Sequence, residues 1–294
     1  MLEEQFDSLT SPAQRAAYSR RDFVRTTVGT GFAAAVLPVV AQTEIKTDSV
    51  GLVVGEVTIP VGGFGMPAYR AAPQARAQAP VVLVVSEIFG VHEYIADVAR
   101  RLAKAGYFAV APELFVRQGD AQSYGEIGKL LSEVISKVPD RQVMGDLDAC
   151  VAWAKAEGAD VSRLGITGFC WGGRIVWLYC AHNPSVKAGV AWYGPLVGQP
   201  SELRPRNPLD IAGSLHAPVL GLYGGADSGI PPDSVQQMEK ALAEGSAAAK
   251  ASRIVVYPGA PHAFHADYRP SYRRDAAEDG GKRCLAWFES HGVR

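Results

Sequence analysis

The segment Gly168-Phe169-Cys170-Trp171-Gly172-Gly173 places a nucleophilic side chain between glycines. An apolar run precedes it and a helical pattern follows it, which predicts a strand, a sharp turn and a helix. This arrangement is the G-x-S-x-G nucleophile elbow with cysteine in the serine position. Glycines suit such an elbow because side chains there would collide with the neighbouring strand and helix. We therefore expect Cys170 to be the nucleophile of an acyl-transfer reaction.

An acid and an imidazole follow the elbow at the ends of later predicted strands. Asp227 comes after the apolar run 219–223, and His262 comes after the run 252–257. Cys, Asp, His is the chain order of the α/β-hydrolase triad, and parallel strands bring their carboxyl ends to one edge of a sheet. We expect Cys170 to attack an acyl carbon, His262 to carry the proton, and Asp227 to orient the imidazole.

The acid and the base each have a rival in the sequence. Asp227 could instead cap the following loop or helix, and Asp233 is a rival acid, although its position favours a helix N-cap. His265 is a rival base, but His262 lies directly at the strand exit. The remaining histidines are expected in loops or on the surface: His92, His182, His216 and His291.

An oxyanion hole is expected from two backbone N–H groups beside the elbow. Trp171 follows the nucleophile, and Ile88 lies in the loop after the first buried strand. Glu87 precedes Ile88, and a carboxylate directly after a buried strand needs a partner. Near Cys170 this carboxylate could take the thiol proton. The alternative is a loop carboxylate paired elsewhere.

The elements that must position these groups alternate along the chain. Residues 52–59 and 66–70 predict a β-hairpin. Further strands are predicted at 81–85, 107–112, 164–167, 188–193, 219–223 and 252–257, and helices at 93–105, 121–137, 140–157, 174–178, 233–244 and 275–290. The predicted fold class is α/β: a three-layer α/β-hydrolase sandwich with a mostly parallel sheet and an N-terminal β-hairpin.

Residues 1–41 have a different composition. Ser19-Arg20-Arg21-Asp22-Phe23 precedes a weakly apolar run, and the pattern resembles a twin-arginine export signal. The run is short for a membrane span, and Pro38 interrupts it. We therefore predict a signal over 1–41, cleaved after Ala41, followed by one domain over 42–294 in the periplasm or outside the cell. A disordered basic N-terminus is the alternative.

The composition restricts the partners. The chain has 294 residues, 48% of them hydrophobic, and a formal net charge of −1. A net charge this close to zero does not indicate binding to nucleic acid. No cysteine or histidine spacing fits a metal site. We expect a cofactor-free and metal-free monomer that binds a small lactone or ester and the export machinery, with no permanent membrane span.

The four cysteines are expected to differ in role. Cys150 and Cys180 lie in helical patterns and Cys284 lies in the last helix, where each would be a small core residue. The sequence also allows a disulfide between Cys284 and either Cys150 or Cys180. A core role is also the alternative for Cys170.

Four segments together resemble the dienelactone hydrolase (carboxymethylenebutenolidase) family: residues 86–91, 111–114, 168–173 and 259–264. The resemblance covers about residues 52–290. It implies hydrolysis of a lactone or ester, of the type that opens dienelactone to maleylacetate. It assigns the nucleophile, acid and base to Cys170, Asp227 and His262. It assigns to Glu87 the role of the family's glutamate, which holds the resting thiol neutral until substrate binds.

The chain departs from this family where the substrate's carboxylate is bound. Family members use arginines and a serine, in part just after the catalytic histidine. Here Ala263 stands in the serine position, and Arg269 is the nearest candidate arginine. Phe89 is a further candidate for substrate contact. A general carboxylesterase and a non-catalytic binding protein on the same fold are the alternatives.

Overall fold

The computed structural model describes residues 44–294. The predicted signal and its cleavage site lie outside these residues. Two antiparallel strands, β1 (Leu52–Val61) and β2 (Phe64–Pro73), form the expected hairpin at one edge of the sheet. Gly62 and Gly63 make its turn with φ of 53° and 85°, the left-handed region that glycine adopts without a steric cost.

The sheet has eight strands in the order β1-β2-β4-β3-β5-β6-β7-β8. All pairs from β4 to β8 are parallel. Every residue of β3, β4 and β7 is buried, as expected for parallel strands covered on both faces. The parallel strands are β3 (Pro80–Val85), β4 (Phe108–Pro112), β5 (Asp160–Phe169), β6 (Val186–Trp192), β7 (Val219–Gly224) and β8 (Arg253–Tyr257).

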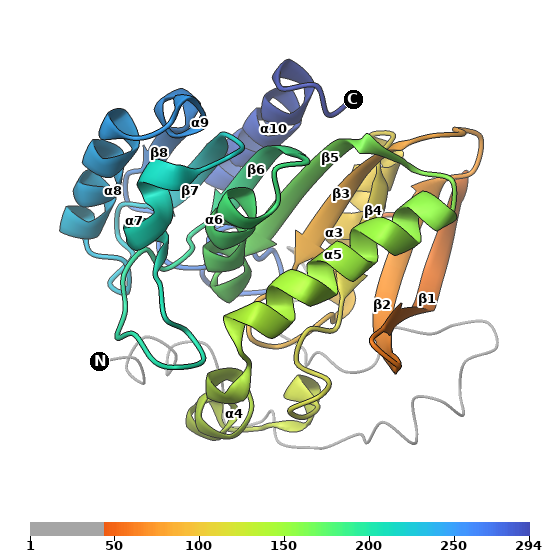
Figure 1. The fold of residues 1–294 in the computed structure, drawn as a ribbon, viewed down its shortest axis with the longest axis horizontal. Coiled ribbons are helices and arrows are strands. Elements are labelled where there is room, and N and C mark those ends of the chain that lie inside the picture. The colour runs from red at the N-terminus through yellow and green to blue at the C-terminus, as the bar shows by residue number, and fades with distance from the viewer. Residues whose placement is uncertain (1–43) are drawn as a thin grey trace.

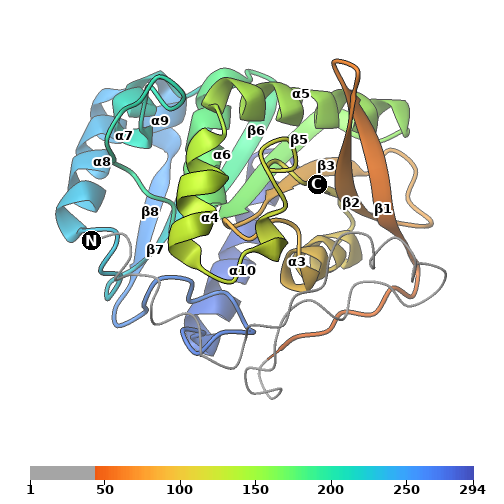
Figure 2. The same cartoon turned by 90° about the horizontal axis from the view of Figure 1, so that it is seen from below.

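Helices cover both faces of the sheet (Figures 1 and 2). On one face lie α3 (Glu93–Lys104) and α10 (Arg274–Ser290), and on the other lie α5 (Asp140–Ala156) and α6 (Trp171–His182). Residues 44–294 form four further helices, which are short or peripheral: α4 (Ile127–Glu133), α7 (Pro208–Ile211), α8 (Pro232–Glu244) and α9 (Ala247–Ala251). The three-layer α/β fold predicted from the sequence is confirmed.

Two local predictions are wrong, and one short helix was not predicted. The helix predicted over 121–137 is interrupted, because the backbone at Tyr124 and Glu126 is extended; only α4 and two 3₁₀ turns form there. The sequence did not predict α9, which Ser246 caps by accepting a hydrogen bond from the Ala249 N–H. Asp233 lies in the first turn of α8 and is not its N-cap, which is Pro231.

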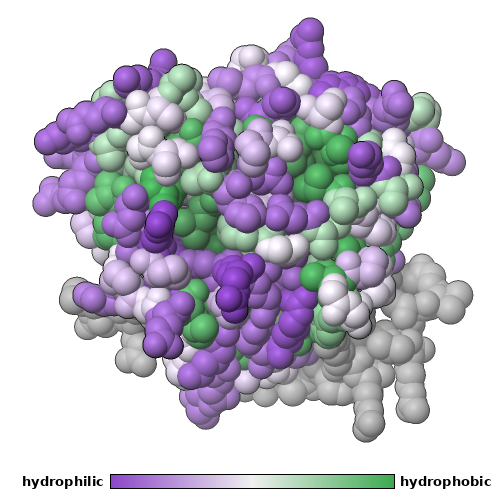
Figure 3. All heavy atoms as spheres, viewed as in Figure 1, coloured by the Kyte–Doolittle hydropathy of each residue, from purple (hydrophilic) through white to green (hydrophobic). Residues whose placement is uncertain are grey.

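The surface of the described residues is mixed. Figure 3 shows hydrophilic side chains spread over the face seen in Figure 1, with smaller hydrophobic areas between them. Within residues 44–294, none of the helices has the length and apolar character that crossing a membrane requires.

Cys150, Cys180 and Cys284 are buried and free, so no disulfide joins them. Burial raises the pKa of each of these thiols. A buried thiol with a raised pKa is a poor nucleophile. The three residues are core side chains, as predicted.

Candidate active site

Cys170 lies at the turn between β5 and α6. Its backbone has φ 54° and ψ −116°, a conformation that non-glycine residues rarely adopt, and the residue is the N-cap of α6. A Cβ on Gly168 would lie 2.4 Å from the Gly172 carbonyl oxygen, and one on Gly172 would lie 2.3 Å from the Val85 oxygen. Only glycine therefore fits at these two positions. The close packing holds the strained turn that presents the thiol.

His262 and Asp227 meet at the carboxyl ends of β8 and β7. Nδ1 of His262 is 2.7 Å from Oδ2 of Asp227, whose side chain is buried. The second oxygen, Oδ1, accepts the Gly229 N–H at 2.9 Å, which fixes the carboxylate. Ala263, directly after the histidine, has φ 57° in the left-handed region. The structure thus brings together the acid and the base that the strand ends predicted.

The environment of His262 favours its charged form. Burial opposes that charge, but interaction with Cys170 and the hydrogen bond to Asp227 outweigh it and raise the pKa of His262 to about 10. Nε2 is buried and makes no well-aligned hydrogen bond among residues 44–294. Such contacts are often loose in a protein without substrate. Nε2 is the ring atom left for Cys170.

The loop after β3 carries the second predicted oxyanion donor. Neither the Ile88 nor the Trp171 N–H bonds to any described residue, so both are available to a ligand. Glu113 fixes this loop by accepting the Val91 N–H at 3.0 Å. Its carboxylate also packs against Gly90, where a Cβ would lie 2.8 Å from Oε2. Glu113 is therefore a structural carboxylate.

Glu87 is paired with Arg269. Nη2 of Arg269 donates to Oε2 of Glu87 at 3.0 Å, and the Tyr268 hydroxyl donates to the same oxygen at 3.2 Å. Nε of Arg269 donates to the Tyr268 hydroxyl at 2.7 Å. The other glutamate oxygen, Oε1, is buried without a described partner. The guanidinium also lies 4.8 Å from the ring centre of Phe89, so Phe89 and Arg269 both belong to this cluster.

His92 is buried, which the sequence did not predict. Only 4% of it is exposed, and neither ring nitrogen has a partner among the described residues. Burial, with the nearby charge of Arg269, lowers its pKa to about 3. Its ring packs edge-on against Tyr268 at 5.2 Å. His92 lies in the loop directly before α3, within the predicted environments, but its burial was not predicted because its neighbours Tyr268 and Arg269 are far away in the sequence.

His265, the rival base, lies elsewhere. Nδ1 of His265 is 2.6 Å from the Tyr94 hydroxyl, and burial lowers the pKa of the imidazole to about 3.

Tyr193 was overlooked in the sequence. It directly follows β6, has φ 37°, and packs its ring edge-on against His262 at 5.1 Å. Asp227 was found because it follows the end of a predicted strand, and the same reasoning would have found Tyr193.

Within the part of the chain that the structure describes, no group of three or more histidine, cysteine, aspartate or glutamate residues could hold a metal ion.

Comparison with known proteins places this geometry in a family. The model of the dienelactone hydrolase family matches residues 66–292. A "Putative carboxymethylenebutenolidase" of Methylorubrum extorquens is 60% identical over 98% of this chain and 99% of its own length. One of the same name from Escherichia coli strain K12 is 54% identical over 91% of this chain and 97% of its own.

Solved structures agree with this relationship. The crystal structure titled "Putative Dienelactone Hydrolase" from Klebsiella pneumoniae is 56% identical, with a TM-score of 0.78 over 81% of this chain and 98% of that one. An acylaminoacyl peptidase of Pyrococcus horikoshii shares only 18% identity at a TM-score of 0.64, over 83% of this chain and 42% of that one, and shows the fold alone. The chain belongs to the dienelactone hydrolase family and is a hydrolase that acts on a lactone or ester.

Proposed function

We propose that this protein hydrolyses a lactone or ester through a covalent thioester on Cys170. The bond from His262 to Asp227, at the same sheet edge as the elbow, carries the proposal. Asp227 orients the imidazole and supports its positive charge. Interaction with Cys170 contributes to the raised pKa of His262, as a thiolate–imidazolium pair requires.

The first half of the reaction would acylate the enzyme. In the thiolate–imidazolium pair the thiol proton of Cys170 is on Nε2 of His262, and the thiolate Sγ attacks the carbonyl carbon. The carbonyl π electrons move to the oxygen, where the N–H groups of Trp171 and Ile88 would stabilise the negative charge. Collapse of this intermediate breaks the bond to the alkoxy oxygen, which takes the proton from His262. In a lactone the leaving oxygen stays in the same molecule.

The second half would release the acid. His262 removes a proton from water, and the hydroxide oxygen attacks the thioester carbon. The carbon–sulfur bond breaks, and the sulfur takes the proton back from His262. The products are a carboxylic acid and the free Cys170 thiol, so no further reactant is needed.

Arg269 is the candidate for recognising an acidic substrate. It is buried beside the oxyanion loop, and Glu87 neutralises its charge in the structure. An incoming carboxylate could replace Glu87 on the guanidinium, and the freed Glu87 would then take the thiol proton in place of His262 and return it to the leaving oxygen. This role rests on the family resemblance and on the partnerless Oε1.

A simple carboxylic ester is the second candidate substrate. The observation that favours it is the Glu87–Arg269 pair itself, because a guanidinium already neutralised attracts a substrate carboxylate less. Ala263 also lacks the hydroxyl that the family uses beside the catalytic histidine.

A matched pair of substrates separates these candidates. We would measure kcat/KM for a carboxylate-bearing unsaturated lactone and for its methyl ester. An acidic substrate is indicated if the carboxylate form is preferred and Arg269→Lys keeps part of that preference. Cys170→Ala should abolish both reactions, whereas Cys284→Ala, which removes another buried thiol, should not. Full activity of Cys170→Ala would contradict the mechanism.

We also propose export through the twin-arginine route, with cleavage after Ala41 and a monomeric mature protein. The sequence around Arg20 and Arg21 supports the export route only.

A further inference from the structure

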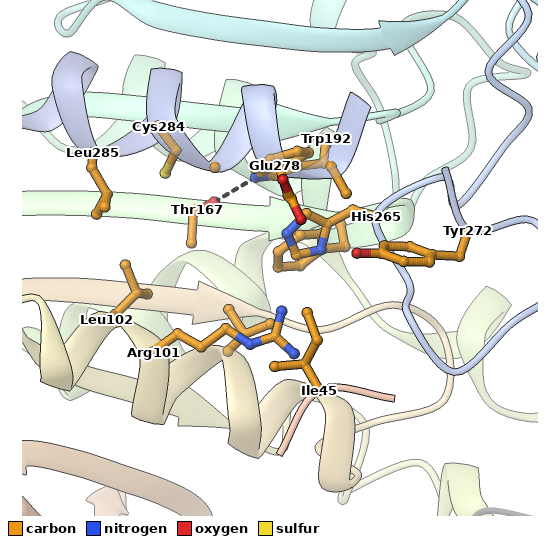
Figure 4. A pocket seen from close by; sticks show the side chains of 14 residues that line it. Ile45, Arg101, Leu102, Thr167, Trp192, His265, Tyr272, Glu278, Cys284 and Leu285 are labelled. Atoms are coloured by element: carbon orange, nitrogen blue, oxygen red, sulfur yellow. Dashed lines mark hydrogen bonds between the residues drawn. The ribbon is translucent and has the colours of Figure 1, made fainter. Parts of the chain in front are cut away.

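A cavity of about 220 Å³ lies between α3 and α10, on the face of the sheet that these helices cover (Figure 4). Its lining does not include Cys170, Asp227, His262 or Glu87. The cavity is therefore separate from the candidate active site, although Phe169, which precedes the nucleophile, forms part of its wall.

The wall is mostly apolar and partly aromatic. Val98 and Leu102 contribute from α3, and Phe169 and Trp192 from the sheet. Two of the exposed large hydrophobic side chains of the described residues, Ile45 and Leu285, also line it. An apolar cavity of about 150 Å³ is large enough to bind benzene. This cavity could therefore hold one substituted aromatic ring, whose faces and edges would meet aromatic neighbours.

One ring nitrogen at the cavity has no partner among the described residues and is accessible to a ligand. Nδ1 of His265 is engaged by the Tyr94 hydroxyl at 2.6 Å, and no described residue bonds to Nε2. His265 is more than nine-tenths buried and lies among the lining side chains (Figure 4). A ligand in the cavity could therefore form a hydrogen bond with this nitrogen.

The charges at the cavity favour a neutral ligand. Two charged residues line the cavity: Arg101, with which the carboxylates of Asp97 and Asp267 already pair, and Glu278, which is exposed to solvent. The imidazole of His265 is neutral at ordinary pH, because burial lowers its pKa to about 3. Depending on the tautomer, Nε2 either donates or accepts a hydrogen bond. A hydroxyl group can do both, so it satisfies either tautomer.

We propose that this cavity is a second binding site, for a neutral single-ring aromatic alcohol whose hydroxyl bonds to Nε2 of His265. Phenol is the simplest such molecule. At seven non-hydrogen atoms it should bind with a dissociation constant of about 1 mM, within the range that ligand size allows.

The test uses glycines that tolerate a side chain. Gly281 lines the cavity, and a Cβ built on it meets no atom within 4 Å. Gly281→Leu should therefore fill the cavity without disturbing the fold. Gly145 is also a helical glycine with no atom within 4 Å, but it is exposed on α5, away from the cavity. Gly145→Leu is the matched control for changing a helical glycine to leucine.

We would measure phenol binding to the full chain by calorimetry and by protein NMR. Phenol should bind the wild type and Gly145→Leu equally, and Gly281→Leu should weaken binding about tenfold or more, while ester hydrolysis by Gly281→Leu shows that it is folded. Unchanged binding to Gly281→Leu would place phenol elsewhere and overturn the proposal, as would no binding to the wild type at about 10 mM, well above the expected constant.

The hydroxyl contact has its own readout. Toluene has the same number of non-hydrogen atoms as phenol but no hydroxyl group. The preference for phenol over toluene should fall about tenfold in His265→Phe, the factor expected for one lost hydrogen bond. An unchanged preference would show that His265 does not bind the hydroxyl.

Discussion

Replacing Arg269 with methionine should cost the protein much of its stability. The side chains of Arg269 and Glu87 are only 7% and 2% exposed, so the variant leaves a carboxylate buried beside a single hydroxyl donor, that of Tyr268. Removing one partner of a buried ion pair typically costs about 3–5 kcal/mol. For a domain of this size, that loss corresponds to a fall in Tm of roughly 6–20 °C.

Two further variants show whether burial is the cause. Arg283 pairs with Asp279 on the surface, where their side chains are 49% and 44% exposed. Arg283→Met should therefore cost less than about 1 kcal/mol. Adding Glu87→Gln to Arg269→Met removes the unpaired charge, so the double variant should be more stable than Arg269→Met alone.

The assay is urea denaturation at pH 7, followed by tryptophan fluorescence, with Tm measured in parallel. Arg269→Met should unfold at a clearly lower urea concentration than Arg283→Met. If the two variants lose equal stability, the Glu87–Arg269 pair does not act as a buried ion pair. The proposed competition between Glu87 and a substrate carboxylate would then lose its basis.

Three other results are expected. The pKa of His262 is raised in the folded state, from 6.5 to about 10; its contribution to stability is therefore complete below pH 6.5 and is lost as the pH rises towards 10. Between pH 6.5 and 10, urea denaturation should show a smaller loss of stability for His262→Gln than for the wild type. Equal losses in the two proteins would refute the raised pKa of His262. Gly172→Ala would place a Cβ 2.3 Å from a backbone oxygen, so it should destabilise the fold or inactivate the protein, whereas Gly145→Ala should do neither. Changing Arg20 and Arg21 together to lysine should block export of the precursor, as judged by cell fractionation; continued export would show that the arginine pair is incidental.

The sequence predicted those parts of the candidate site that depend on local order along the chain. Alternating strands and helices gave the three layers, and the strand-end rule found Cys170, Asp227 and His262 without knowledge of their distances. The strained turn at Cys170 was predictable because the glycines around it are adjacent in sequence.

The remaining features depend on contacts between distant segments. Glu87 and Arg269 are 182 positions apart, and only the folded chain shows that they pair. The burial of His92 could not be predicted for the same reason, since its ring packs against Tyr268 from the loop after β8. The cavity between α3 and α10 cannot be seen in either helix alone, because each contributes only one wall.

Trapping the acyl-enzyme tests the central claim most directly. The protein would be mixed with an activated acetate ester, quenched in acid during turnover, and digested for peptide mass spectrometry. We predict one added acetyl group on the peptide that contains Cys170, and none on the peptides with Cys150, Cys180 or Cys284. Rapid hydrolysis with no acyl group on Cys170, or with full activity in Cys170→Ala, would contradict the account.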